Sequence, residues 1–251
     1  MILETLIGNT VFRFDTSEGI EISIMLDADR LGPNCFYAPP FDATPLVSGN
    51  FVGDTRKGSP VNFYNVKINP HGNGTHTECV GHISTERVSI NEVLRDSLFA
   101  CQLVSIYPDK LENGDKVISA GTLQMIAENL RDEKAIIIRT LPNPPEKERW
   151  TWSGTNPTYF EAAGLQHLLD KGTEHLLTDL PSVDREEDGG RLEAHKTWWN
   201  YPQEINRKNT ITEMVYVPDD VKDGSYLVQI QIPPFQLDAA PSRVFIFKNY
   251  E

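Results

Sequence analysis

The stretch KAIIIRTL at residues 134–141 is a short apolar run rich in β-branched residues. Such runs are typical of strands buried on both faces, as in parallel sheets covered by helices. The segments around it alternate between strand and helix patterns. The expected strands are CQLVSIY (101–107) and HLLTDLP (175–181), and the expected helices are SINEVLRDSL (89–98), ISAGTLQMIAENL (118–130) and PTYFEAAGLQHLLDKG (157–172). The alternation predicts an α/β fold with right-handed crossovers and a largely parallel sheet.

Both ends of the chain have β-type sequence instead. Further strands are expected at IEISIML (20–26), VNFYNVKI (61–68), TEMVYV (212–217), SYLVQIQI (225–232) and SRVFIF (242–247). Between the first two, residues 32–51 form a long irregular stretch, and long loops inside compact domains often border functional sites. The sequence therefore predicts one α/β domain over residues 1–251 with an additional β layer.

The composition excludes several classes of partner. The 251 residues carry a net charge of −13, whereas binding to nucleic acid or to an anionic membrane needs a basic surface. No apolar run reaches the ~20 residues of a membrane span, and no signal peptide is visible at the N-terminus. Three cysteines form no pairing framework, so reduced thiols and a cytoplasmic location are expected.

Three of the six histidines fall within twelve residues, in the segment HGNGTHTECVGH from His71 to His82. Imidazole nitrogens and carboxylate oxygens are the usual ligands of Zn²⁺ and neighbouring divalent ions. His76 and Glu78 are two residues apart, so in an extended segment their side chains point to the same face. The pattern indicates a metal or catalytic site, although it matches no zinc-finger or HExxH spacing. A glycine-rich turn with hydrogen-bonded histidines is the structural alternative.

The segment GTHTECVGH (74–82) resembles the signature of the cyclase family, which includes bacterial kynurenine formamidase. The family pattern reads His-x-Gly-Thr-His-x-Asp-x-Pro-x-His. Further similarity follows in the same order over about residues 60–247. It lies in LLTDLPSVD (176–184), AHKTWW (194–199), ITEM (211–214) and LVQIQIPPFQLDAAPSRVFIF (227–247). This resemblance implies a swivelling β/β/α fold, with a mixed sheet and flanking helices, and metal-dependent hydrolysis of an amide-like bond.

The resemblance also implies roles for individual residues. His76, Glu78, His195 and Glu213 correspond to metal ligands of the family, and His82 to its proton donor and acceptor. The implied cofactor is a divalent metal, Zn²⁺ ahead of Mn²⁺, with one or two ions per chain. A small-molecule substrate and a homo-oligomer, dimer or tetramer, are the implied partners.

The first histidine of the family pattern is displaced here. Gly72 occupies its place, and His71 lies one residue earlier, so His71 can act as a ligand only if the following turn bulges by one residue. Glu78 replaces the family aspartate, and Val80 replaces its proline. A longer carboxylate and a bulged turn both reposition ligand atoms, so these changes can compensate for one another.

Two classes of function follow. The first is a hydrolase in which the metal activates water, hydroxide attacks the carbonyl, and His82 passes the proton to the leaving nitrogen. Its substrate would be an amide of a small aromatic molecule, like the arylformamide N-formylkynurenine; isatin-like cyclic amides and lactones are alternatives. The second is a non-catalytic ligand-binding protein on the same fold.

Several neighbouring residues are expected to have structural roles. His167 and His175 are expected to be structural, and Trp198 and Trp199 to lie in the core or in a subunit contact. Local hydrogen bonds that shape a loop are expected for Ser182 and Asp184, and the Cys79 side chain should point away from Glu78. Thr75 either orients a ligand or is simply a β-former.

Overall fold

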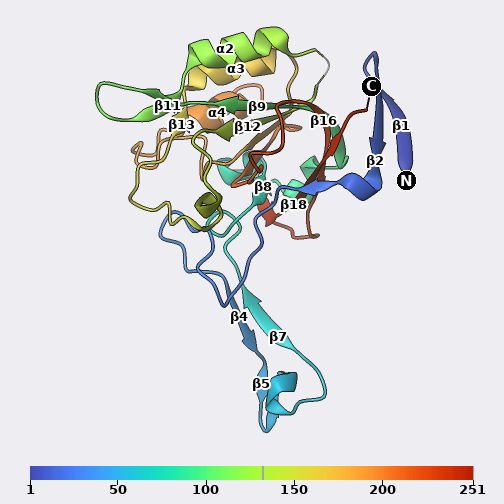
Figure 1. Cartoon of the computed structure of the whole chain (residues 1–251). Coiled ribbons are helices and arrows are strands. Elements are labelled where there is room, and N and C mark those ends of the chain that lie inside the picture. Colours follow the sequence, from blue (N-terminus) through green and yellow to red (C-terminus); the bar gives the residue numbers. More distant parts are fainter. Residues whose placement is uncertain (132, 251) are drawn as a thin grey trace.

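The structure is a computed structural model that describes residues 1–131 and 133–250. Figure 1 shows a body built on one large sheet, a two-stranded hairpin at the N-terminus beside it, and a long arm that projects away from the body. Within the described residues, no helix combines the length and the apolar character needed to cross a bilayer.

The large sheet has nine strands in the order β17-β8-β15-β14-β12-β9-β16-β18-β3. In chain order these are β3 (Ile20–Glu21), β8 (His76–Glu78), β9 (Leu98–Ile106), β12 (Ala135–Thr140), β14 (His175–Thr178), β15 (Thr210–Glu213), β16 (Gly224–Gln231), β17 (Ala239–Pro241) and β18 (Arg243–Lys248). Strands β9, β12, β14 and β15 are mutually parallel, and every other pair is antiparallel. The mixed sheet is thus confirmed, while the largely parallel arrangement holds only for its centre.

Strand β12 lies at the middle of the sheet and is buried along its whole length. Ile136 and Ile138 pack into an apolar cluster with residues of the helices, whereas Ile137 packs into the cluster on the opposite face. Successive side chains of a strand point to opposite faces, so a continuous apolar run has to be covered on both sides. This explains why the strand at 134–141 is the one most easily predicted from the sequence.

Helices α2 (Ala120–Asn129), α3 (Ala162–Asp170) and α4 (Glu193–Trp199) lie over one face of the sheet (Figure 1). Helix α2 begins after Ser119, whose side-chain oxygen accepts a hydrogen bond from the Thr122 amide. Helix α3 is followed by Gly172 at a φ of +81°, the left-handed conformation that commonly ends a helix. The short helix α1 (Ile90–Val93) begins after Ser89.

The smaller elements fill the rest of the fold. They are the hairpin β1 (Ile2–Ile7) and β2 (Thr10–Asp15); the arm strands β4 (Asp42–Pro45), β5 (Val47–Ser48), β6 (Phe51–Val52) and β7 (Tyr64–Lys67); a sheet of β10 (Asp109–Lys110), β11 (Lys116–Ile118) and β13 (Tyr159–Phe160); and the 3₁₀ turns η1 (Thr16–Glu18), η2 (Thr55–Lys57), η3 (Val80–His82) and η4 (Pro145–Arg149).

Several predicted elements differ from the structure. The helix expected at 89–98 is only the short α1, and Leu98 already belongs to β9. The strand expected at 20–26 pairs with β18 only over Ile20–Glu21, because the amide of Ile24 bonds instead to the Thr75 hydroxyl. The helix expected from Pro157 begins at Ala162, since Tyr159–Phe160 forms β13 and pairs with β11. The strand expected at 212–217 ends at Glu213, where Met214 adopts a φ of +53°.

Helices α2 and α3 approach closely at Gly164. A Cβ at this position would lie 2.6 Å from Cδ1 of Leu123 and 2.9 Å from the backbone Cα of Ala120. Gly164→Ala is therefore expected to lower the free energy of unfolding by about 1–3 kcal/mol, the usual cost of overpacking. Chemical denaturation measures this.

Gly121, within α2, gives the matched control. A Cβ there meets no atom within 4 Å. Gly121→Ala should raise the free energy of unfolding by about 0.5–1 kcal/mol through helix propensity alone. Equal effects of the two substitutions would contradict the close approach at Gly164.

Candidate metal centre

Strand β8 carries two of the predicted metal ligands, His76 and Glu78, into the interior of the sheet. Both side chains are fully buried. The strand lies between β15 and β17 in antiparallel register, and this register places Glu213 directly opposite His76. Oε2 of Glu213 is 3.3 Å from Nε2 of His76. Two segments separated by more than 130 residues thus bring their functional groups together through backbone pairing.

His71 reaches the same site through the glycine-rich turn, as its displaced position requires. Its Nδ1 lies 3.0 Å from Oε2 of Glu78. Gly74 takes a φ of +73° in this turn, and a Cβ on Gly72 would lie 2.2 Å from Cβ of Ala38. No side chain fits at position 72, so this chain presents its histidine one residue earlier.

His195 approaches from helix α4 and is held by Asp184. Its Nδ1 donates to Oδ2 of Asp184 at 2.6 Å, and its Nε2 lies 3.2 Å from Oε1 of Glu78. The Asp184 carboxylate also accepts bonds from the backbone amides of Ala194 and His195. Asp184 thereby fixes both the start of α4 and the orientation of the His195 imidazole. The sequence predicts only local loop contacts for this residue.

His82 and Asp238 form the more exposed side of the site. Nδ1 of His82 lies 3.6 Å from Oδ2 of Asp238 and 3.9 Å from Oε2 of Glu78. The ring of His82 packs against that of His71, with centroids 4.2 Å apart. The side chain of His82 is 32% exposed, whereas those of His76 and Glu78 are almost completely covered. His82 is therefore the histidine best placed to meet a molecule arriving from solvent.

The cluster has the donor set of a divalent metal site. Three overlapping groups each bring three ligand atoms within 4.8 Å of one another: His71, His76 and Glu78; His71, His82 and Asp238; and Glu78, His82 and His195. Nε2 of His76 and Oε2 of Glu78 are buried and have no hydrogen-bond partner among the described residues. Their nearest polar neighbours are Glu213 and His71, at 3.3 and 3.0 Å, without hydrogen-bond alignment. Buried polar atoms are normally hydrogen-bonded, so this arrangement favours a cation bound among these side chains.

The pKa values of the buried histidines also favour a bound cation. Burial alone would lower the pKa of His71, but Asp238 and Glu78 raise it to about 10. Burial acts likewise on His195, and there Asp184 and Glu78 raise the pKa to about 10. The carboxylates around these two histidines therefore stabilise positive charge in a buried space. A divalent cation held by imidazole and carboxylate groups can supply the charge that protons on these rings otherwise provide.

All six residues predicted for the site thus lie together, and Asp238 is an additional member. Asp238 precedes β17, and its pKa is lowered by the hydrogen bond from His71. It lies within the closing segment 227–247, but it is not near any other predicted ligand in the sequence, so no motif marks it. Only the pairing of β17 with β8 reveals it.

The predictions for surrounding residues are largely confirmed. Cys79 points into the apolar core, and burial raises its thiol pKa to about 12. His175 is buried outside the cluster and pairs with Thr210, and burial lowers its pKa to about 4. Trp198 and Trp199 are core residues. Thr75 donates to the carbonyl of Met214 at 2.5 Å, so it ties the ligand segment to the residue after Glu213.

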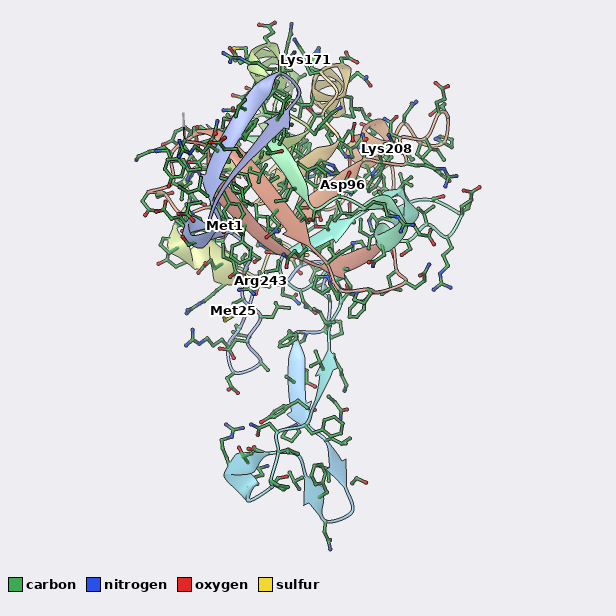
Figure 2. All side chains as sticks on the ribbon, turned by 90° about the vertical axis from the view of Figure 1, so that its right-hand side faces the viewer. Met1, Met25, Asp96, Lys171, Lys208 and Arg243 are labelled. Carbon is green, nitrogen blue, oxygen red and sulfur yellow. The ribbon has the colours of Figure 1, made fainter. Side chains whose placement is uncertain are left out.

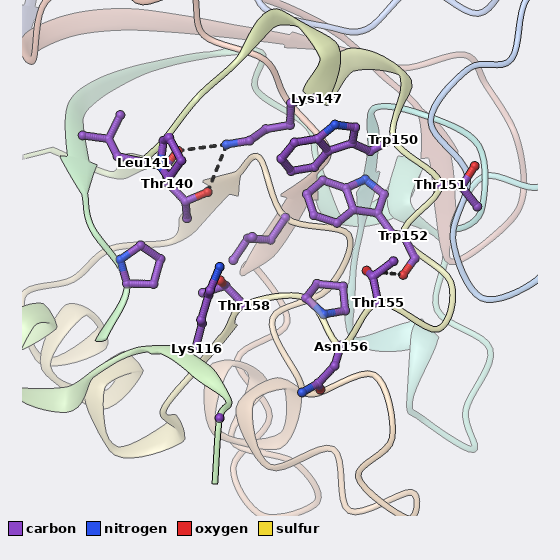
Figure 3. Close-up of a pocket in the computed structure, with 15 residues that line it drawn as sticks. Lys116, Thr140, Leu141, Lys147, Trp150, Thr151, Trp152, Thr155, Asn156 and Thr158 are labelled. Atoms are coloured by element: carbon purple, nitrogen blue, oxygen red, sulfur yellow. Dashed lines mark hydrogen bonds between the residues drawn. The ribbon is translucent and has the colours of Figure 1, made fainter. Parts of the chain in front are cut away.

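A separate cavity of about 550 Å³ lies at the carboxyl ends of the central strands and is shown in Figure 3. Trp150 and Trp152 form one wall, in an edge-to-face arrangement with centroids 5.0 Å apart. At its base Lys147 donates to Thr140. None of the histidines of the metal centre lines this cavity. The imidazole and carboxylate groups suited to metal binding lie in the histidine cluster and not in this cavity.

Asp184→Asn tests the role of this carboxylate in orienting His195. The amide keeps the shape but removes the negative charge that holds the Nδ1 proton. Loss of such a partner usually weakens metal binding 10–100-fold, so an increase of about that size is expected in the Kd for Zn²⁺. Competition with a chromophoric chelator measures it. Asp170→Asn, on the exposed end of α3, is the control; an unchanged Kd in Asp184→Asn would contradict the proposed role.

Comparison with known proteins identifies relatives of this architecture. The family model described as "Putative cyclase" matches residues 20–185. No curated protein matches the sequence.

Solved structures match over nearly the whole chain. A predicted metal-dependent hydrolase from Bacillus stearothermophilus is 16% identical with a TM-score of 0.62, covering 92% of this chain and 98% of that one. Isatin hydrolase A from Labrenzia aggregata, bound to benzyl benzoate, is 10% identical with a TM-score of 0.67, covering 93% and 94%. Isatin hydrolase A from Ralstonia solanacearum is 11% identical with a TM-score of 0.63, covering 92% and 91%. At these identities the likeness establishes the fold.

Proposed function

Since this chain belongs to the cyclase family, we propose that it is a metal-dependent hydrolase of an amide bond in a small aromatic molecule. One observation carries the proposal. The sequence places the predicted ligands on separate segments, and the fold brings them around two buried atoms, Nε2 of His76 and Oε2 of Glu78, that lack a well-aligned hydrogen bond among the described residues.

His71, His76, Glu78, His195 and Glu213 are the proposed ligands, with Zn²⁺ ahead of Mn²⁺ and one or two ions per chain. When bound, such an ion lowers the pKa of water and stabilises negative charge on a carbonyl oxygen. The protein fixes the ligand geometry beforehand, because β8 is buried between two strands and His195 is anchored by Asp184. Ligands held in this way need little reorganisation during the reaction.

His82 is the proposed proton carrier. Its Nδ1 faces the carboxylates of Asp238 and Glu78, which leaves Nε2 as the ring nitrogen available to water or substrate. An imidazole ring can both accept and donate a proton, so His82 can take a proton from water and deliver it to the leaving nitrogen. Asp238, whose Oδ2 lies 3.6 Å from Nδ1, helps to keep the ring in place. The partial exposure of His82 fits an exchange of protons with substrate.

An arylformamide such as N-formylkynurenine is the first proposed substrate class. Isatin-like cyclic amides are the second, favoured by the isatin hydrolases whose folds match over more than 90% of both chains. Both reactions break an amide carbon–nitrogen bond whose nitrogen is attached to an aromatic ring. The same metal centre can serve either, and the shape of the surrounding loops decides between them.

Metal content and turnover together test the proposal. The purified chain should contain one or two equivalents of Zn or Mn by elemental mass spectrometry, without added metal. It should hydrolyse at least one member of a panel of arylformamides, isatins and lactones. Dialysis against a chelator should abolish turnover, and added Zn²⁺ or Mn²⁺ should restore it. A chain that neither holds nor recovers metal would instead be a non-catalytic member of the fold.

A further inference from the structure

The cavity of about 550 Å³ lies where the central parallel strands end (Figure 3). Pro108 and Leu180 line it shortly after β9 and β14, and Thr140 lines it at the end of β12. Its lining residues all belong to the body from which the arm projects (Figures 1 and 2). Small-molecule sites usually measure ~300–1,000 Å³, and ligands of open α/β sheets bind outside the carboxyl ends of the strands. The size and the position of this cavity therefore favour a bound ligand.

Two tryptophans give the cavity an aromatic wall. Trp150 and Trp152 meet edge to face, with ring centroids 5.0 Å apart. The amide of Asn34 donates to the carbonyl of Trp150, and the amide of Trp152 donates to the carbonyl of Asn34. Trp152 is buried, whereas Trp150 is 36% exposed. Because the backbone is held on both sides and the rings pack together, a flat aromatic ligand can stack on Trp150 with little ordering of the protein.

Trp152 also separates the cavity from the metal centre. It packs with Cys35 and Met214 in a small buried cluster, and Met214 directly follows the proposed ligand Glu213. The indole of Trp152 therefore lies between the two places. The cavity is a site of its own, and a ligand can occupy it whether or not the metal centre is filled.

Lys116 brings an ammonium group to the cavity. Its side chain extends from β11 on the side away from the tryptophans (Figure 3). Among the described residues, the lysines that form ion pairs are Lys134 and Lys147. Lys147 also lines the cavity, but its ammonium group is occupied by three hydrogen bonds to Thr140 and Asp179. The ammonium group of Lys116 is therefore the one available to an anion.

The surroundings of Lys116 strengthen the attraction for an anion. Lys110 lies directly opposite Lys116 in the antiparallel pair of β10 and β11. Like charges in directly opposed positions destabilise a sheet, and a bound anion offsets that repulsion. The parallel pairing of Val117 with Tyr159 also places the preceding residues, Lys116 and Thr158, beside one another. Thr158 lines the cavity, and its hydroxyl can donate to the same anion.

We propose that this cavity binds a planar aromatic carboxylate. The aromatic ring of the ligand lies against Trp150, and its carboxylate accepts hydrogen bonds from Nζ of Lys116 and from the hydroxyl of Thr158. One available ammonium group matches one negative charge, whereas a phosphate ester brings a charge of about −2. The site is independent of the proposed hydrolase activity, because it shares no residue with the metal centre.

Isothermal titration calorimetry of the full chain with 2-naphthoate tests the site. Saturable binding with a Kd of about 0.1–1 mM is expected for a ligand of this size. The same site should remain after dialysis against a chelator, because the metal takes no part in it. Absence of saturable binding up to about 5 mM would overturn the proposal. Loss of the binding on chelation would place 2-naphthoate at the metal centre and would overturn it as well.

Two substitutions of Trp150 test the aromatic contact, and both are titrated after chelation. Trp150→Leu removes the aromatic face and should raise the Kd for 2-naphthoate at least about tenfold. Trp150→Phe keeps an aromatic ring and should raise it less. Equal affinity of wild type and folded Trp150→Leu would show that the ligand does not stack on this wall.

Lys116→Met tests the charge contact. It should raise the Kd for 2-naphthoate at least about tenfold, since a hydrogen bond to a charged group is lost. The weaker binding of the neutral 2-naphthalenemethanol should not change, because this alcohol has no carboxylate for Lys116 to bind.

Lys110→Met is the matched control, because Lys110 is exposed on β10 opposite Lys116 and does not line the cavity. It should change the Kd for 2-naphthoate less than about threefold, as expected of an exposed charge without direct contact. Equal losses in Lys110→Met and Lys116→Met would indicate a general effect of positive charge and would overturn the assigned contact. Far-UV circular dichroism shows whether each variant is folded.

Discussion

Replacing His76 with alanine is expected to lower kcat at least about 10³-fold and to remove most of the bound metal. His76 is fully buried, its Nε2 has no hydrogen-bond partner among the described residues, and it faces Glu213 at 3.3 Å. The proposed cation would contribute several kcal/mol to transition-state stabilisation, and each 1.36 kcal/mol corresponds to a factor of ten in rate. Metal analysis and steady-state kinetics on the active substrate measure both losses.

His167→Ala is the control for this substitution. His167 lies on α3, away from the cluster, and removal of its imidazole should leave metal content and kcat unchanged. Thermal unfolding of both variants shows whether the fold is retained. Full turnover in folded His76→Ala would remove the metal-centre assignment, whereas equal losses in both variants would indicate general destabilisation.

Replacing Lys147 with methionine is expected to lower the free energy of unfolding by about 3–5 kcal/mol. Lys147 is 3% exposed, and its Nζ donates to the carbonyl and the hydroxyl of Thr140 and, at 2.8 Å, to Asp179. Removing one partner of a buried ion pair leaves the other charge uncompensated. For a chain of this size, the melting temperature should fall by about 6–20 °C.

The loss in Lys147→Met should depend on pH. Burial raises the pKa of Asp179, and Lys147 opposes that rise. Without Lys147, the folded-state pKa of Asp179 lies further above its unfolded value. A group of this kind stabilises the fold at low pH, and this stabilisation is lost as pH rises through the folded pKa. The deficit relative to wild type should therefore shrink as the pH is lowered from 7 towards 5.

Lys171→Met, at the exposed end of α3, is the control, and its effect should stay within about 0.5 kcal/mol. A melting temperature for Lys147→Met within 2 °C of wild type would contradict the structural importance of the buried pair. The same pair anchors η4, which leads directly into the tryptophans of the 550 Å³ cavity (Figure 3).

The central strands and helices can be predicted from the sequence because burial of the sheet on both faces requires continuous apolar runs in its strands. Residues 134–141 show this most clearly. The arm leaves no such pattern, because its strands are short and its apolar side chains face solvent. It lies in the stretch expected to be irregular together with the strand expected at 61–68, of which only Tyr64–Lys67 is a strand.

In the metal centre, too, some residues can be predicted from the sequence and others cannot. His76, Glu78 and His82 are close in sequence, so their spacing carries the signal. His71 is displaced by one residue, and the close contact of Gly72 with Ala38 explains why only the structure settles its position. Asp238 and the role of Asp184 depend on strand pairing and on a helix terminus far along the chain. Those relations have no local sequence pattern.

Both outer edges of the nine-stranded sheet end in very short strands. At one edge β17 has three residues and includes Pro241, which has no amide hydrogen to offer; at the other, β3 has two residues. Open edges recruit further strands, and short or proline-containing ones resist this. The large sheet is therefore protected against growing into fibrils during synthesis and refolding. Deleting residues 239–241 would remove that protection and expose the strand that carries His76 and Glu78.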